Sequence, residues 1–170
     1  MASKWIEEAE CLILSRAGEP TISDVEALVL ISLDHVVSRR FTKTMVSTAL
    51  TVRLAYMMRL NHEDGRLASL TQERRTRLMW CIFVFDKFFS SGRAEFTLCP
   101  KDTIHLQLPW SEQSFLLDEP ASTEPLRLQG GTQTTFKLGI TALCIRLLDI
   151  RDRISRYVFL LQRIAQSNKS

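Results

Sequence analysis

The chain has 170 residues, a length that predicts one domain with a sizeable hydrophobic core. Its 22 basic and 19 acidic residues give a formal net charge of +3, which is too small to indicate a nucleic-acid surface by itself. No apolar run approaches the ~20 residues that a membrane helix needs, and acidic residues interrupt the N-terminal stretch, so we expect no membrane contact and no secretory signal.

Three amphipathic helices are expected in the first sixty residues. Residues 4–17 form the first pattern, which Gly18 and the following proline end. A Ser-Asp-Val-Glu capping box at Ser23 opens the second helix, which runs to about residue 38. The third runs over about residues 42–60, and Asn61 is its expected C-cap because asparagine tolerates the left-handed conformation.

The central element of the predicted fold is a buried helix over about residues 71–90. Thr71 is its expected N-cap, and the apolar run that follows is too long for a typical strand. Because this run is apolar on nearly all sides, the helix belongs inside a bundle. Asp86 interrupts the run and needs a partner in that interior. The candidate partners are Arg77, Lys87 and Arg93.

A long irregular connection follows, over about residues 91–132. It contains Gly92, Pro100 and Pro109, shows little helical period, and includes a weakly alternating stretch at 103–108. So long a loop within one domain is usually functional or partly disordered. The paired glycines Gly130 and Gly131 are among its expected mobile points.

The last third of the chain carries one apolar stripe at spacings of three and four, from Phe136 to Ala165. This pattern fits one long helix, or two helices that break near residues 149–153. Gly139 lies inside the pattern. We expect the stripe to pack onto the bundle, and dimerisation through it stays open. Its members are Phe136, Ile140, Leu143, Leu147, Ile150, Ile154, Val158, Leu161 and Ala165.

Sequence patterns of catalytic or metal sites were not found. The four cysteines, at positions 11, 81, 99 and 144, are too far apart for zinc-ligand spacing, and we expect Cys11, Cys81 and Cys144 to be buried thiols. His35, on a helix, is expected at the surface or half-buried. The chain has no HExxH, GxSxG, phosphate-loop or GxGxxG pattern, so we expect a protein that is not an enzyme and binds no cofactor itself.

The central helix also carries a family resemblance. Basic residues, Leu-x-Trp, Asp-Lys, a Gly-Arg turn and a Leu-Pro ending occur in this order, and the pattern resembles the fungal-specific transcription factor domain, the middle homology region of fungal zinc-cluster regulators. The resemblance is strongest over residues 21–109. Arg59 and Ala94 stand where the family has glycine and proline. The motif residues are Arg75, Arg77, Leu78, Trp80, Asp86, Lys87, Gly92, Arg93 and Pro109.

The resemblance implies a single all-α regulatory domain over residues 1–170, a multi-helix bundle in a nuclear transcription regulator. It implies regulation of DNA-templated transcription through an effector, a partner or contacts within the parent protein. Zinc and DNA binding are then expected only from an N-terminal six-cysteine cluster, which none of the four cysteines here supplies. Homodimers and transcriptional co-regulators are the expected partners.

A small effector is expected between helices, in a cleft rimmed by the long connection. Phe85, Phe88, Phe89 and Phe96 are candidates to line it, although a core role for these rings is the stronger interpretation. Two other functions stay open. One is a stand-alone helical module for dimerisation, partner binding or small-ligand binding, and the other, ranked last, is a small helical enzyme.

Overall fold

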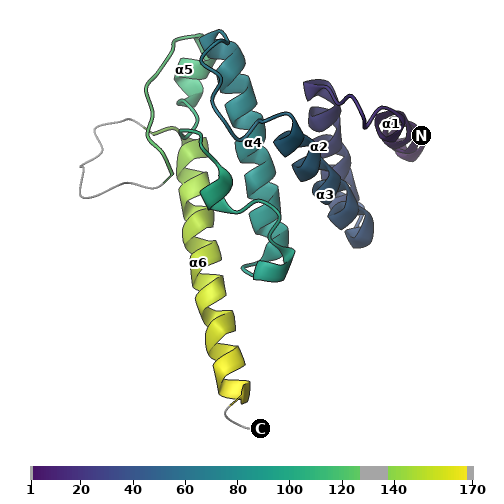
Figure 1. The fold of residues 1–170 in the computed structure, drawn as a ribbon, viewed down its shortest axis with the longest axis vertical. Coiled ribbons are helices and arrows are strands. Elements are labelled where there is room, and N and C mark those ends of the chain that lie inside the picture. The colour runs from purple at the N-terminus through teal and green to yellow at the C-terminus, as the bar shows by residue number, and fades with distance from the viewer. Residues whose placement is uncertain (1, 127–137, 168–170) are drawn as a thin grey trace. The chain divides into compact units, whose positions relative to one another are not determined.

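A computed structural model describes residues 2–126 and 138–167, and these residues form an all-α fold (Figure 1). Six α-helices and two short 3₁₀ helices occur within the described ranges, and the only β pairing there consists of two isolated bridges. The predicted fold class is therefore confirmed. Phe136, Gly130, Gly131 and the end of the predicted connection, residues 127–132, lie outside the described residues.

The chain divides into two compact units, Met1–Leu60 and Asn61–Ser170. The first holds helices α1, α2 and α3, and the second holds α4, α5, α6 and both 3₁₀ helices. The interpretation of residues 1–170 as one regulatory domain stays a prediction.

The first unit is built on α2 (Ile22–Val37) and α3 (Phe41–Met57), which pack together, and α1 (Ala2–Ser15) contacts α2. A buried hydrogen bond of 2.8 Å joins the hydroxyl groups of Ser32 on α2 and Ser47 on α3. The His35 side chain is fully buried, and its Nε2 lies 2.6 Å from a carboxylate oxygen of Glu10 on α1. The expected surface position of His35 is wrong, because the histidine links α2 to α1.

The start of α2 differs from the predicted cap by two residues. Thr21 is the N-cap, and its hydroxyl accepts a hydrogen bond from the Asp24 amide. The Asp24 carboxylate accepts one from the Thr21 amide at 2.8 Å, so aspartate plays the part usually given to glutamate in a capping box. Ser23, the predicted cap, lies inside the first turn because the helix begins at Ile22.

The end of α3 also differs from the prediction. Met58 is the C-cap, and Arg59 adopts the left-handed conformation with φ of 53°. The amide of Leu60 donates to the Ala55 carbonyl, and that of Arg59 donates to the Tyr56 carbonyl. These two bonds define a Schellman motif. Asn61 is therefore not the cap. Arg59, at the position where the family resemblance expects glycine, takes the conformation that favours glycine.

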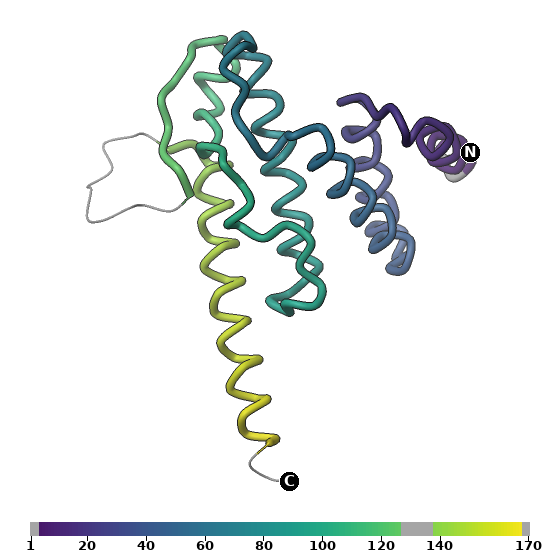
Figure 2. Tube along the Cα trace, in the orientation of Figure 1, coloured from purple at the N-terminus to yellow at the C-terminus, as the bar shows by residue number. Residues whose placement is uncertain are grey.

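The second unit is built on two long helices, α4 (Ser69–Ser90) and α6 (Ile140–Ser167), which lie side by side (Figure 1). The connection between them contains the 3₁₀ helices η1 (Ala94–Phe96) and η2 (Lys101–Thr103) and the short helix α5 (Glu112–Leu116). The chain turns at the C-terminal end of α4 and runs back along that helix before it reaches α5 (Figure 2).

Helix α4 (Ser69–Ser90) begins two residues before the predicted range, and its N-cap is Ala68, so the predicted cap Thr71 is wrong. Trp80 and Phe83 are almost completely buried, and their rings meet edge to face with centroids 5.3 Å apart. The most buried face is not purely apolar, because it also contains polar and charged side chains. These are Glu73, Thr76, Asp86, Lys87 and Ser90.

Helix α6 is one continuous helix, so the alternative with a break near residues 149–153 is wrong. It begins at Ile140, which leaves Gly139 just before it. The expectation that the apolar stripe packs onto the bundle is also wrong. The buried residues of α6 are Ala142, Ile145, Asp149 and Asp152. The described members of the stripe are exposed, because α6 packs through this other face and pairs its aspartates with Lys101 and Arg156.

The burial of the cysteines differs from the prediction. Cys11 and Cys144 are exposed and Cys81 is half-buried, where the apolar sequence context had indicated burial. Burial raises the pKa of the Cys81 thiol.

Among the helices within residues 2–126 and 138–167, none combines the length and apolar character needed to cross a membrane.

Candidate functional site

The family motif lies on α4, where it binds the connection that runs back along the helix. Asp86 makes the first of these contacts. One of its carboxylate oxygens accepts a hydrogen bond of 2.8 Å from the Leu98 amide, and the other accepts one of 3.0 Å from the Cys99 amide. The Lys87 ammonium group lies 3.2 Å from the same carboxylate and donates to the Cys99 carbonyl at 2.9 Å. Of the three predicted partners, Lys87 is the one that pairs with Asp86.

Trp80 makes the second contact, two turns nearer the start of α4. Its indole N–H donates to the Gln107 carbonyl at 2.7 Å. The tryptophan is 1% exposed, so the hydrogen bond satisfies a polar group that the core would otherwise leave unpaired. Trp80 therefore contributes both apolar packing and a fixed position for the connection.

Glu73 and Arg77 make the third contact, at the backbone of Trp110. The Glu73 carboxylate accepts from the Trp110 amide at 3.0 Å, and Arg77 donates to the Trp110 carbonyl at 2.8 Å. The two side chains also pair with each other at 2.8 Å, and the Arg77 guanidinium lies 4.2 Å from the centre of the Phe115 ring. Burial raises the pKa of the Glu73 carboxyl, and the bonds from Trp110 and Arg77 offset only part of this effect.

Three remaining motif residues lie around these contacts. Arg75 is half-buried; hydrogen bonds from Arg66 are the main cause of the lowered pKa of Asp64, and the charge of Arg75 adds to them. Leu78 is half-buried and Pro109 is buried. The motif residues on α4 thus serve mainly to bind residues 98–110. The sequence indicated a need for such a binding partner only for Asp86.

The Gly-Arg turn brings the end of α4 against α6. Gly92 has φ of 81°, and a Cβ atom placed on it would lie 2.5 Å from Cβ of Ser155 on α6. Only glycine fits both the backbone conformation and the close approach. The next residue, Arg93, stacks its guanidinium over the Phe159 ring of α6 at 5.3 Å.

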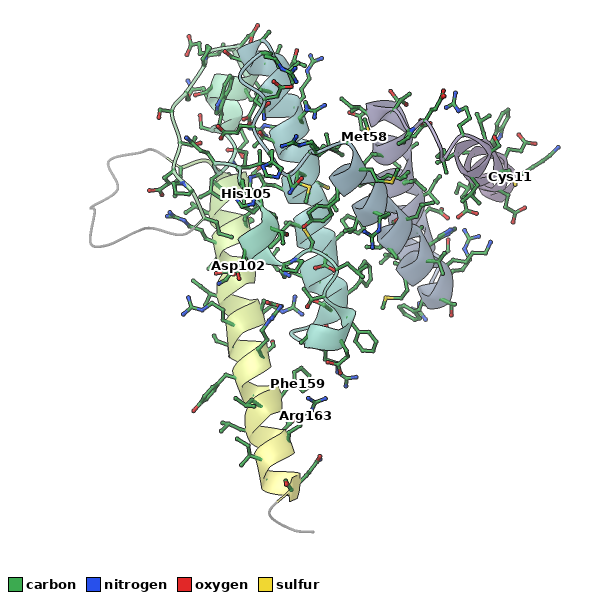
Figure 3. All side chains as sticks on the ribbon, in the orientation of Figure 1. Cys11, Met58, Asp102, His105, Phe159 and Arg163 are labelled. Atoms are coloured by element: carbon green, nitrogen blue, oxygen red, sulfur yellow. The ribbon has the colours of Figure 1, made fainter. Side chains whose placement is uncertain are left out.

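A groove of about 490 Å³ opens beside this turn, between η1 and the C-terminal half of α6. Its charged lining residues are Arg93, Glu95, Arg156 and Arg163. Phe159 and Arg163 project from the same side of α6 (Figure 3). Arg156 is paired with Asp152 at 2.8 Å. Because Asp152 neutralises Arg156, the remaining charges are those of Arg93 and Arg163 against Glu95, which give the groove a net positive charge.

The four phenylalanines predicted to line an effector cleft gather near the end of α4, but the lining of this groove contains none of them. Phe85 and Phe89 are half-buried neighbours with ring centroids 6.0 Å apart. Phe88 is exposed, and the Arg151 guanidinium stacks over its ring. Phe96 is exposed and lies near Arg93. A cleft built from these four rings stays a prediction.

Sequence reasoning missed the contribution of α6 to this region. Arg156, Phe159, Arg163 and Gln166 follow spacings of three and four, so a helical wheel of the last third could have placed them on one face. It could not have placed that face opposite Gly92 and Arg93, some sixty residues earlier. The described residues hold no cluster of three or more histidine, cysteine or carboxylate side chains that could bind a metal ion.

The comparisons with known proteins agree with the resemblance. Residues 7–168 match the model of the fungal specific transcription factor domain. The zinc-cluster protein "Zn(2)-C6 fungal-type transcription factor FTF1c" of Fusarium oxysporum is 27% identical over 177 residues, which cover 91% of this chain and 19% of that protein. "Uncharacterized transcriptional regulatory protein C1327.01c" of Schizosaccharomyces pombe is 25% identical, over 91% of this chain and 18% of the relative.

The chain spans about a fifth of the length of these curated relatives. No solved structure matches it. The family match covers almost the whole sequence, including every motif residue on α4 and the α6 face beside Gly92. The predicted family is confirmed: the chain belongs to the family of fungal specific transcription factor domains.

Proposed function

We propose that the chain is the regulatory portion of a nuclear zinc-cluster transcription factor and that it modulates transcription without catalysing a reaction. DNA and zinc binding belong, in this proposal, to another part of the parent protein. The family match carries the proposal. The relatives whose names include a zinc cluster or transcriptional regulation support it.

The geometry of α4 supports a non-catalytic function. The buried Asp86, Lys87 and Glu73 and the half-buried Arg77 are charged groups on one helix, and each is bound to the backbone of residues 98–110. Groups held in this way stabilise a rigid surface rather than exchange protons with a substrate. Regulation would then depend on what the surface of the domain binds.

A reporter assay tests the proposal. The 170-residue chain is fused to a heterologous DNA-binding domain in yeast, and expression from a promoter with matching sites is measured. We expect the fusion to raise or lower expression at least threefold relative to the DNA-binding domain alone. A Trp80→Ala fusion, expected to unfold, is the control and should lose the effect. Equal expression from all three at equal protein levels would contradict the proposal.

A second candidate function is the binding of a small anionic effector, which the positive groove beside Gly92 favours. Phe159 and Leu160 offer apolar contact there, and Arg93 and Arg163 offer charge to a carboxylate or phosphate group. The test is a thermal-shift titration with citrate and inorganic pyrophosphate. We expect stabilisation that Arg163→Gln reduces and the exposed Arg53→Gln leaves unchanged. Equal stabilisation of both variants would assign the effect to nonspecific ion binding.

A further inference from the structure

Helix α6 has one covered face and, opposite it, an apolar face that is exposed. The covered face contacts the rest of the second unit through Ala142, Ile145, Asp149 and Asp152. The opposite face carries eight large side chains, between 47% and 72% exposed, that we call the outer seam. The outer seam consists of Ile140, Leu143, Leu147, Ile150, Ile154, Tyr157, Leu161 and Ile164.

The spacing of the outer seam is that of a coiled coil. The eight positions alternate between steps of three and four residues throughout α6, so they occupy positions a and d of four successive heptads. The buried residues occupy positions c and f, on the opposite side of the helix. A continuous apolar stripe of this length on a soluble protein marks an interaction site. Its geometry fits another α-helix that lies along α6.

The charges beside the outer seam indicate the chemistry of that helix. Positions e and g hold three charged residues, Arg146, Arg151 and Arg153. The acidic residues of α6 are Asp149 and Asp152, and both are buried on the covered face. A partner helix therefore meets only positive charge along the edges of the seam, and acidic residues at its own e and g positions give attractive pairs.

A second copy of this chain fits the seam less well. In a parallel pair of α6 helices, Arg146 of one copy would lie beside Arg151 of the other, because position g faces the e position of the next heptad. In either orientation, two copies offer no acidic side chain at these positions. Like charges at e and g positions disfavour a pairing.

We propose that the outer seam of α6 binds an amphipathic helix of a partner protein, with apolar residues at its a and d positions and acidic residues at e and g. This inference rests on the proposed function, in which the domain acts through surface contacts. It specifies the contact: the apolar seam supplies affinity, and the three arginines select acidic partners. Arg153 is the most informative of them because it is exposed, whereas Arg146 pairs with Glu124 and Arg151 stacks on Phe88.

Two designed 28-residue peptides test the proposal by fluorescence anisotropy with the full chain. Both carry leucine at a and d, and one carries glutamate and the other lysine at e and g. We expect the glutamate peptide to bind at least tenfold more tightly. Leu147→Glu combined with Ile154→Glu should abolish binding, while the exposed Leu30→Glu on α2 should not. Arg153→Glu should reduce the difference in affinity between the glutamate and lysine peptides. A loss of folding alone would weaken the binding of both peptides and leave this difference unchanged.

Three outcomes would overturn the proposal. One is equal binding of the two peptides, and another is a stable dimer by light scattering that the double glutamate variant dissociates. The third is binding by the 170-residue chain but not by the full-length parent protein, since a segment of the parent would then cover the seam. A reporter effect without preference for the glutamate peptide would refute this inference alone and leave the proposed function standing.

Discussion

The ammonium nitrogen of Lys87 lies 3.2 Å from a carboxylate oxygen of Asp86, its neighbour in the chain, and each side chain is 2% exposed. Adjacent helical residues point in different directions, so this pair meets only because both side chains turn toward the backbone of Leu98 and Cys99. The lysine neutralises a carboxylate that has already bound two backbone amides.

Lys87→Met should therefore be strongly destabilising. It leaves the Asp86 charge buried without its counterion, and the expected cost is about 3–5 kcal/mol in the free energy of unfolding. Urea unfolding followed by circular dichroism measures it. Lys43→Met, at an exposed position, is the matched control and should change stability by less than about 0.5 kcal/mol. A loss of under 1 kcal/mol for Lys87→Met would mean that the pair is open to water in solution.

Trp80 should show two separable contributions to stability. Trp80→Ala removes a fully buried ring and should cost about 3–5 kcal/mol. Trp80→Phe keeps much of the packing but leaves the Gln107 carbonyl without its donor, with an expected cost of about 1–3 kcal/mol. Trp5→Ala is the control, because Trp5 is 70% exposed. If the alanine variants of Trp80 and Trp5 unfolded at the same urea concentration, the central position of α4 would be refuted.

Arg59→Gly should stabilise the protein by about 1 kcal/mol, because a left-handed backbone costs roughly that much for a residue with a side chain. Arg53→Gly supplies the comparison. Arg53 is exposed within the same helix, α3, where glycine is expected to cost about 1 kcal/mol. The melting temperatures of the two variants should move in opposite directions. A fall for both would show that the Arg59 side chain contributes more than its backbone conformation costs.

Gly92→Ala should destabilise by more than about 1 kcal/mol, since alanine would adopt φ of 81° and its Cβ would meet the Ser155 side chain. Gly18→Ala is the control, because no heavy atom lies within 4 Å of the added Cβ and the backbone there needs no left-handed conformation. Chemical denaturation of both variants distinguishes a packing constraint from a general cost of replacing glycine. Similar midpoints would mean that the α4–α6 contact at Gly92 is loose.

The N-terminus of α6 should lose stability in acid. Burial tends to raise the pKa of Glu112, but hydrogen bonds from the Thr141 side chain and the amides of Thr141 and Ile140 lower it to about 2. Because the folded-state pKa lies below the ordinary value of 4.5, the stabilisation is complete above about pH 4.5 and is lost as the pH falls toward 2.

Glu112→Ala should cost about 1 kcal/mol at pH 7, as expected for the loss of a capping side chain, and almost nothing near pH 2. Unfolding free energies of wild type and variant across this pH range measure the difference. Glu119→Ala, an exposed change in the same connection, is the control at pH 7. A pH-independent difference for Glu112→Ala would assign its effect to packing instead of charge.

The helices of this protein were predictable because their apolar spacing is regular, and the need of Asp86 for a partner followed from its place in an apolar run. The residues that cover each face were not predictable. The stripe of α6 predicted burial, yet α6 packs through a face with two aspartates, which a sequence pattern assigns to solvent. The Asp152–Arg156 pair is a local i,i+4 contact within α6, but the missing information for Asp149 is tertiary, because its partner is Lys101, far away in the sequence.

The candidate site was likewise predictable only in part. The sequence placed the motif on one helix, but the partners of Trp80 and Arg77 are backbone carbonyls about thirty residues away, which carry no residue-specific signal. The observed helix caps differ from the predicted ones by a few residues, because the sequence alone does not distinguish neighbouring candidates. Ser23 and Thr21 have the same capping chemistry, and the choice between them depends on where the chain enters the helix after Pro20.

The contacts of α4 with residues 98–110 have a consequence for how this segment can vary in length. Its attachment points at Leu98, Gln107 and Trp110 match fixed positions along a rigid helix. An insertion or deletion between them would shift every later backbone group out of reach of its partner on α4. Although its only helix is the short η2, the segment therefore has a defined register, and insertions or deletions are tolerable only before the first attachment point or after the last.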